Sequence, residues 1–159
     1  MNIAHIMVQP VRVTSRDTSL DTVARLMLAH RIGCLPIVDP ANRLCGIITE
    51  ADFQAKERGV PFSTFRAPRI FGQWMSHEGI EHIYQAACSR TAADIMSTPV
   101  VTLTPDDSVE YAVRLMLDHH ISHLPVVREG VPIGIVSRHD LLRLMLPTPH
   151  EAARGVSGG

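Results

Sequence analysis

The sequence has only three cysteines, and this odd number argues against a disulfide framework. Cys34, Cys45 and Cys88 show no CxxC spacing, so neither a redox dithiol nor a common zinc site is indicated. We expect reduced, mostly buried thiols. No apolar run approaches the roughly 20 residues needed to cross a bilayer, which excludes a simple membrane-spanning class.

Charge of one sign is not in excess either, because 15 Lys and Arg stand against 16 Asp and Glu in 159 residues. This balance gives no broad basic footprint for nucleic acid. The opening MNIAHIMVQP lacks the basic start and long apolar stretch of a signal peptide. We therefore expect a cytoplasmic protein that contacts neither membrane nor nucleic acid. The 45% of hydrophobic residues suffices for one compact domain, or two small ones sharing a core.

What the chain does have is an internal repeat. Residues 4–53 return, with a shift of 89, as residues 93–141, and the second copy has lost one turn residue. A repeat of about 50 residues must be recognised before any other fold interpretation. Identical positions include the run RLML at 25–28 and 114–117, and the pairs His30/His119, Pro36/Pro125, Gly46/Gly134 and Asp52/Asp140.

Each copy predicts the order β-α-β-β-α. Residues 11–13 and 100–103 are expected as first strands, and apolar stripes at helical spacing follow at 20–28 and 109–117. Thr18 with Asp21, and Asp107 with Glu110, resemble capping boxes at the helix starts. The runs LPIV/LCGIIT and LPVV/PIGIVS predict hairpins, each followed by a second helix. Thr49 and Ser137 stand where the N-caps of those helices belong.

The order of these residues resembles the CBS domain, named after cystathionine β-synthase. The pattern is IM…P-V…D-x-S…RLML…H-x-I-x-x-LP-h-V…G-h-h-T/S-x-x-D, found twice. Two such domains in tandem resemble a Bateman module. The resemblance implies a mixed α/β (α+β) fold of two pseudo-symmetric repeats packed through their sheets. We expect repeat 1 at 1–58, a linker at 59–92, repeat 2 at 93–146 and a disordered tail at 147–159.

The candidate functional residues lie in GIITEAD (46–52) and GIVSRHD (134–140). Glycine permits close approach of the strand backbone to a ligand. The Thr or Ser hydroxyl and the following helix N-terminus could hold a phosphate. The Asp one turn later could accept both hydroxyls of a ribose. The alternative is purely structural, because a hydroxyl N-cap and an acid in the first turn are favoured in any helix.

The resemblance implies an adenine nucleotide such as AMP, ADP or ATP as a regulatory ligand, with no catalytic cofactor, in two clefts between the repeats. Because Glu50 corresponds to Arg138, we expect site two to bind phosphate better. Site one would use Thr49 and Asp52 with Val101, Thr102, Ile121, Ser122, His123 and Pro125. Site two would use Ser137, Arg138 and Asp140 with Arg12, Val13, Ile32, Gly33, Cys34 and Pro36.

Two other features have simpler interpretations. The histidines of HHISH (119–123) with His139 could hold a metal, but no supporting Cys or carboxylate spacing accompanies them, and we predict no metal site. The segment between the repeats contains Phe62, Phe65, Phe71 and Trp74, followed by an apolar helical pattern. This predicts a packing extension or dimer contact; a lid over the ligand is the alternative.

The sequence therefore favours a non-catalytic regulatory module that responds to an adenine nucleotide. The resemblance adds a homodimer with helices facing one another, and an unknown effector protein. An enzyme is not supported, since neither a GxxxxGK phosphate loop nor a nucleophile–base pair is present. The alternatives left open are a structural or partner-binding protein without nucleotide, and a module for S-adenosylmethionine, NAD(H) or a metal.

Overall fold

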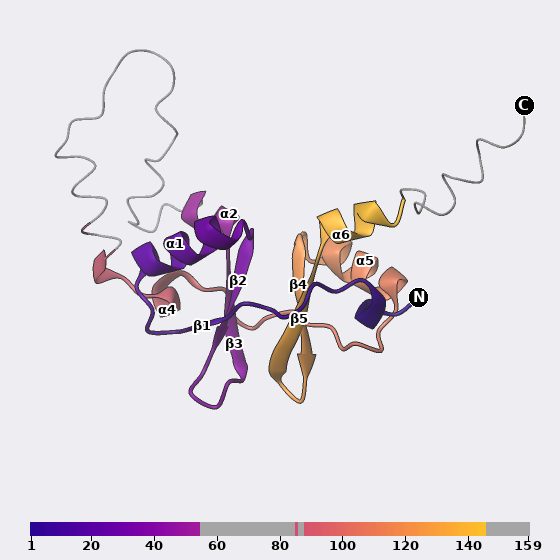
Figure 1. The fold of residues 1–159 in the computed structure, drawn as a ribbon, viewed down its shortest axis with the longest axis horizontal. Coiled ribbons are helices and arrows are strands. Elements are labelled where there is room, and N and C mark those ends of the chain that lie inside the picture. Colours follow the sequence, from indigo (N-terminus) through magenta and orange to yellow (C-terminus); the bar gives the residue numbers. More distant parts are fainter. Residues whose placement is uncertain (55–84, 86–87, 146–159) are drawn as a thin grey trace, which may run out of the picture. The chain divides into compact units, whose positions relative to one another are not determined.

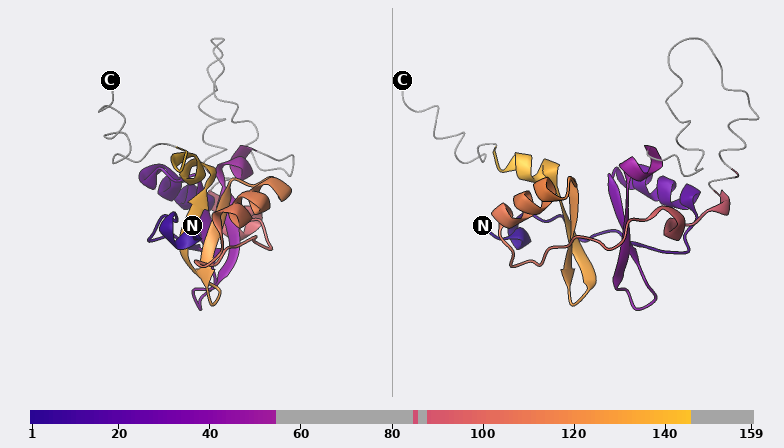
Figure 2. Two further views of the ribbon diagram at one scale, coloured as in Figure 1. Left: turned by 90° about the vertical axis from the view of Figure 1, so that its right-hand side faces the viewer. Right: turned by 180° about the vertical axis from the view of Figure 1, so that it is seen from behind.

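The computed structural model describes residues 1–54, 85 and 88–145. The chain divides into two compact units, each described here by itself. The repeat-one unit is Arg12–Val100, and the repeat-two unit combines Met1–Val11 with Val101–Gly159. Figures 1 and 2 show the elements of each unit. The predicted linker aromatics, the helix pattern around Tyr84 and the predicted disordered tail lie outside the described residues.

The repeat-one unit is built on a three-stranded sheet in the order β1-β2-β3. β1 (Thr14–Ser15) runs parallel to β2 (Cys34–Val38), which forms an antiparallel hairpin with β3 (Leu44–Thr49). The helices are α1 (Leu20–His30), α2 (Glu50–Gln54) and α4 (Ala92–Ile95). All five residues of β2 are buried, as expected of a central strand.

The repeat-two unit has the same plan with a two-stranded sheet. β4 (His123–Arg128) pairs antiparallel with β5 (Val131–Ser137), and the parallel pairing of a first strand is reduced to a single bridge, Leu103 to Val126. The helices are the short 3-10 turn η1 (Ile3–His5), α5 (Val109–Asp118) and α6 (Arg138–Arg143). The mixed α+β fold predicted from the repeat is therefore confirmed.

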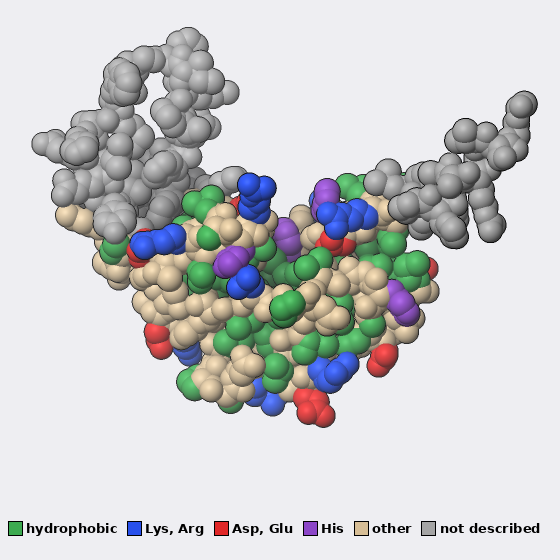
Figure 3. Space-filling model, viewed as in Figure 1, with side chains coloured by type: hydrophobic (Ala, Val, Ile, Leu, Met, Phe, Trp, Pro, Cys, Tyr) green, Lys and Arg blue, Asp and Glu red, His purple; other side chains and the backbone are tan. Residues whose placement is uncertain are grey.

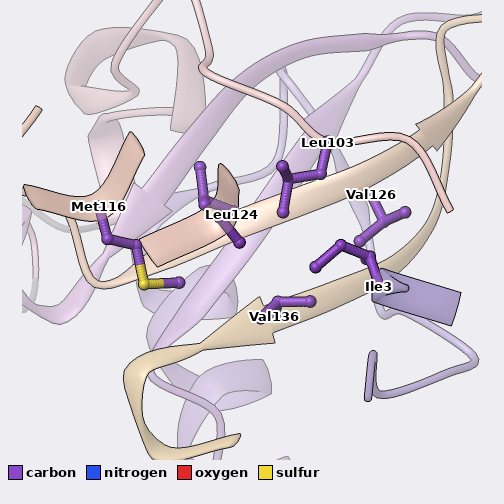
Figure 4. Packing of buried hydrophobic residues seen from close by; sticks show 7 residues of the cluster. Ile3, Leu103, Met116, Leu124, Val126 and Val136 are labelled. Carbon is purple, nitrogen blue, oxygen red and sulfur yellow. The ribbon is translucent and has the colours of Figure 1, made fainter. Parts of the chain in front are cut away.

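The first segment of each sequence repeat packs with the other repeat. Ile3 is fully buried in the repeat-two core, where Figure 4 shows its side chain pointing toward Val126 and Val136. Ala92 is likewise buried in the repeat-one core beside Val23 and Met27. We call residues 1–8 the first arm and residues 91–97 the second arm. The helical stripe pattern gave no sign of this exchange, because periodicity reports only local structure.

Three local predictions need correction. Residues 11–13 are not a strand, since pairing begins only at Thr14. The N-caps of α1 and α5 are Ser19 and Ser108, not Thr18 and Asp107. The Thr18 hydroxyl is instead bonded to that of Thr14 at 2.7 Å, and Asp107 Oδ2 accepts the Thr104 amide at 2.6 Å.

The apolar stripes of α1 and α5 are only partly buried. Leu20, Val23 and Met27 lie in or beside the core, but Leu28 is 79% exposed. Its equivalent in α5, Leu117, is 63% exposed. The outer edge of each stripe is thus apolar and uncovered, which a helical pattern alone could not distinguish from a core face.

Candidate functional site: two polar turns at strand ends

The polar turn of the repeat-two unit joins β5 to α6. Ser137 ends the strand, and both its amide and its hydroxyl donate to Asp140 Oδ2, at 2.8 and 2.6 Å. The Asp140 amide donates back to Ser137 Oγ at 3.3 Å, which completes a capping box. Asp140 is 9% exposed, the one buried charged side chain among the described residues. A carboxylate so deeply placed is tolerable because two donors of Ser137 bond to one of its oxygens.

The polar turn of the repeat-one unit repeats this arrangement between β3 and α2. The Thr49 amide and hydroxyl donate to Asp52 Oδ2, at 2.7 and 3.1 Å. Asp52 is half-buried rather than buried. The same spacing therefore gives the same local geometry twice, with the tighter and deeper version in the repeat-two unit.

The T/S-x-x-D spacing by itself makes a helix cap. Thr91 and Asp94, outside either motif, form the same capping box, with the Thr91 amide 2.7 Å from Asp94 Oδ2. Asp94 is exposed, however, and does not follow a sheet strand. The motif turns differ from this ordinary cap by their burial and by their place at the end of a core strand.

The helix N-termini offer fewer free donors than the sequence suggested. The Arg138 amide donates to the Ser122 carbonyl at 3.0 Å, and the Glu50 amide to the Gly33 carbonyl at 3.1 Å. The Ser137 and Thr49 hydroxyls already donate to their Asp partners. A phosphate at either turn would therefore need the hydroxyl to rotate away from the carboxylate, or would have to bind at the next amides.

The strand pairing places one more candidate side chain beside each turn. Cys34 is the register partner of Thr49, and His123 is the partner of Ser137. Burial raises the pKa of the Cys34 thiol to about 12, and the charge of Glu50 adds to the rise. Cys34 is therefore a neutral packing group at ordinary pH. Of the three cysteines only Cys34 is buried, so the expectation that most of the thiols are buried was wrong.

The remaining candidates are distributed along the neighbouring strands. Pro36 and Pro125 are buried opposite Ile47 and Ile135. Partly buried Ile32, Val101 and Ile121 pack against the cores, while Val13 and Thr102 are half-buried and Arg12 and Ser122 are exposed. Each predicted site combines residues of both units, so the two complete sites stay predictions.

The motif glycines have a packing role that the sequence did not reveal. A Cβ at Gly134 would lie 2.8 Å from Met7 Sδ, and a Cβ at Gly46 would collide with the side chain of Met96. Each glycine is therefore needed because a methionine of an arm lies directly over it. The recurrence of Met7 and Met96 at equivalent positions was the available signal. Both methionines pack against the cores, of which Met27 and Met116 are members.

Arg138 lies at a feature that the sequence analysis missed. Its exposed side chain lines a groove of about 500 Å³ between α5 and α6, whose other lining residues are apolar. Apolar side chains at the surface are visible in Figure 3. The groove is lined by Val109, Val113, Met116, Leu117, Arg138, Leu141, Leu142, Leu144 and Met145.

Within residues 1–54, 85 and 88–145, no group of three or more His, Cys, Asp and Glu side chains has an arrangement that could hold a metal ion. His119 caps the end of α5 and His120 follows it, as expected of histidines at a helix end. No helix in this part of the chain is both long and apolar enough to span a membrane.

Comparison with known proteins decides the family. The family model of the CBS domain matches twice, at residues 3–56 and 92–147. The chain belongs to the CBS domain family. The two matches cover both polar turns and all of the two arms except residues 1, 2 and 91.

The relatives include the mitochondrial CBS domain-containing protein CBSX3 of Arabidopsis thaliana, which is 32% identical over 87% of this chain. The chain spans 57% of that relative's length. Since CBSX3 is named as mitochondrial, the cytoplasmic location of this chain stays a prediction.

Two solved structures define the fold further. The CBS domain of a CBS domain containing membrane protein from Sphaerobacter thermophilus has a TM-score of 0.76 and 42% identity, covering 92% of this chain and 88% of the other. The CBS domain pair of protein MJ0100, in complex with 5′-methylthioadenosine and S-adenosyl-L-methionine, has a TM-score of 0.67 and 25% identity. It covers 91% of this chain and 95% of its own.

Proposed function

We propose that this chain is a non-catalytic regulatory module that binds an adenosine-containing small molecule at its polar turns. The observation that carries the proposal is the pair of turns, each with a strand-end hydroxyl and a shielded carboxylate. In the repeat-two unit, Oδ2 of Asp140 takes both bonds from Ser137, and no hydrogen bond to Oδ1 is made within the described residues. That oxygen is the natural acceptor for ribose hydroxyls.

The proposed ligand class is defined by the adenosine group that all the candidate ligands contain. The structurally similar MJ0100 pair is described with two adenosine compounds, one of them uncharged at the 5′ position. The hydroxyls and first amides at both turns are already engaged, which favours a ribose-centred contact over a phosphate-centred one. AMP, ADP and ATP remain the predicted ligands, with S-adenosylmethionine and 5′-methylthioadenosine as members of the same class.

The two turns would bind with unequal strength. A unit charge 5–8 Å from a phosphate at an effective dielectric near 20 contributes about 2–3 kcal/mol. Both Glu50 and Arg138 are exposed, so solvent reduces this to about 1 kcal/mol or less. We propose that the repeat-two turn binds phosphate-bearing ligands better, and that uncharged 5′ groups remove the preference.

A homodimer is the second part of the proposal. The groove between α5 and α6 and the exposed Leu28 and Leu117 present apolar surface that a second copy could cover. Sedimentation of wild type and Leu117→Glu tests this. A dimer that dissociates in the variant supports the homodimer, and a wild-type protein that is monomeric at about 100 µM contradicts it.

The experiment that tests the ligand is a thermal-shift panel with AMP, ADP, ATP, S-adenosylmethionine, 5′-methylthioadenosine and NAD(H). A ligand at 100 times its Kd stabilises the folded state by about 2.7 kcal/mol. We expect at least one adenosine compound to raise the melting temperature and guanosine monophosphate to have no effect. If none shifts it, the structural alternative without a nucleotide replaces the proposal.

A further inference from the structure

The two arms pair with β5 and β3 at equivalent positions of the two repeats. We call β5 and β3 the motif strands, because they carry Gly134 and Gly46. In the repeat-two unit the Val8 amide donates to the Ile135 carbonyl at 2.8 Å, and the Ile135 amide to the Val8 carbonyl at 3.1 Å. In the repeat-one unit Ser97 and Ile47 exchange the same two bonds, at 2.9 and 3.2 Å. Each pair lies one residue past the motif glycine and two residues before the Thr or Ser of the turn.

The contact combines backbone pairing with side-chain packing. Met7 lies over Gly134 and Met96 over Gly46, so a larger residue at either glycine would force the arm away. Ile3 and Ala92 anchor the same arms in the cores, both at 0% exposure. Val8 and Ser97 differ chemically but make the same backbone bonds, so this pairing does not require a particular side chain at that position.

The segment of β5 between the arm contact and the polar turn is short, and β4 pairs with its other edge. Gly134 to Ser137 spans four residues, and Val136 within it is fully buried. On β4, Leu124 pairs with Val136 and His123 with Ser137. The arm therefore supplies the second edge of a strand segment whose last residue makes the capping bonds to Asp140.

From these contacts we infer that Met7 and Met96 are positioning residues for the polar turns. A docked arm fixes the motif strand, and the strand fixes the Ser137–Asp140 or Thr49–Asp52 geometry. The consequence for ligand binding rests on the proposed function. A ligand that requires the ordered turn binds better to the state in which the arm is paired with the motif strand. By reciprocity, the ligand then holds the arm in place, so arm release is coupled to ligand loss.

The arms also continue into residues that the predicted sites require. Arg12 and Val13 follow Val8 by four and five residues, and Val101 and Thr102 follow Ser97 by the same distances. A ligand contact at those residues restrains the chain close to the arm.

The test is hydrogen exchange of single amides in the full chain, first without ligand. Met7→Ala removes the packing on Gly134 without adding a clash, and Gly134→Ala adds the clash. We expect exchange at Val8 and at the Ser137 and Asp140 amides to rise together, by about tenfold in Met7→Ala and more in Gly134→Ala. The amides of Ala112 and Met116 in α5 should keep their protection, which shows that the unit stays folded.

A double variant and variants at other positions distinguish a positioning role from a general loss of stability. The double variant Gly134→Ala with Met7→Ala removes the clashing sulfur and should regain turn protection relative to Gly134→Ala alone. His5→Ala, an exposed residue of the same arm, is the control and should match wild type. Gly46→Ala should affect Thr49 and Asp52 but leave Ser137 and Asp140 unchanged.

Protected turn amides in Met7→Ala, despite faster exchange at Val8, would overturn the inference. In a second stage, titration with AMP and with 5′-methylthioadenosine should show weaker binding by Met7→Ala and slower arm exchange in the bound wild type. Bound wild type with unchanged arm exchange would overturn the coupling. Absence of binding by wild type would refute the proposed function, while the ligand-free exchange would still decide whether the arm positions the turn.

Discussion

The two units use one scaffold with different side chains at the polar turn. In the repeat-two unit Asp140 is 9% exposed and receives the Ser137 hydroxyl at 2.6 Å; in the repeat-one unit Asp52 is half-buried and receives the Thr49 hydroxyl at 3.1 Å. Cys34 and Glu50 stand where the other unit has His123 and Arg138. The two units therefore share the geometry of the cap but differ in the charged residues beside it.

The largest effect should come from equivalent buried leucines. Leu35 and Leu124 are both 0% exposed, and truncating either to Ala should lower the free energy of unfolding by about 2–5 kcal/mol, since a cavity remains. Urea unfolding followed by circular dichroism measures this. Leu28→Ala and Leu117→Ala change the same residue type at exposed positions and should cost about 0.5 kcal/mol or less in the monomer. Equal losses in buried and exposed variants would refute the assigned cores.

An alkaline instability should belong to the repeat-one unit. The thiol pKa of Cys34 is raised from 9.0 to about 12, so the folded state keeps its proton where the unfolded state has lost it. This stabilising term is fully present below pH 9 and declines as pH rises toward 12, by about 1.4 kcal/mol per pH unit. Unfolding of wild type and Cys34→Ala at pH 8 and pH 10.5 measures the difference.

Cys34→Ala should lose less stability between those pH values than wild type does, by about 2 kcal/mol. Cys88→Ala, at an exposed thiol, is the control and should follow wild type. A thiol reagent at pH 8 should label Cys88 rapidly and Cys34 only after unfolding. Rapid labelling of Cys34 in the folded chain would contradict its burial.

The capping carboxylates should contribute less to the free energy of unfolding than the buried leucines do. Asp140→Asn weakens two bonds to Ser137 in a buried place and should lower the free energy of unfolding by about 1.5–3 kcal/mol. Asp52→Asn should cost less because that side chain is half-buried, and Asp94→Asn least because it is exposed. Thermal unfolding at pH 7 gives the order. Asp94→Asn as costly as Asp140→Asn would remove the distinction between motif turns and ordinary caps.

The smallest effect concerns two equivalent helix ends. Arg31 and His120 follow α1 and α5 in the left-handed region, with φ of 52° and 53°. Glycine adopts this conformation without steric cost, so Arg31→Gly and His120→Gly should each stabilise by about 0.5 kcal/mol. Differential scanning calorimetry can resolve the change. Destabilisation in only one unit would mark a side-chain contact that differs between the repeats.

Much of each repeat followed from local sequence pattern. The hairpins, the helical stripes, and the N-cap at Ser137 could be predicted because turn residues, 3.6-residue spacing and capping preferences act over a few residues. The exchange of the arms could not, because Ile3 and Ala92 lie in clusters whose other buried members are at least 100 and 44 positions away in sequence. The packing role of Gly46 and Gly134 was not visible in the sequence for the same reason, since the methionines over them come from the arms.

The central claim is that the buried polar turns bind adenosine compounds, and titration calorimetry tests it most directly. AMP is titrated into wild type, Asp52→Asn, Asp140→Asn and the matched cap variant Asp94→Asn. The account predicts binding by wild type and Asp94→Asn, a loss of at least about tenfold in Asp140→Asn, and a smaller loss in Asp52→Asn. Equal affinity in all four proteins would contradict it, as would a loss confined to Asp94→Asn.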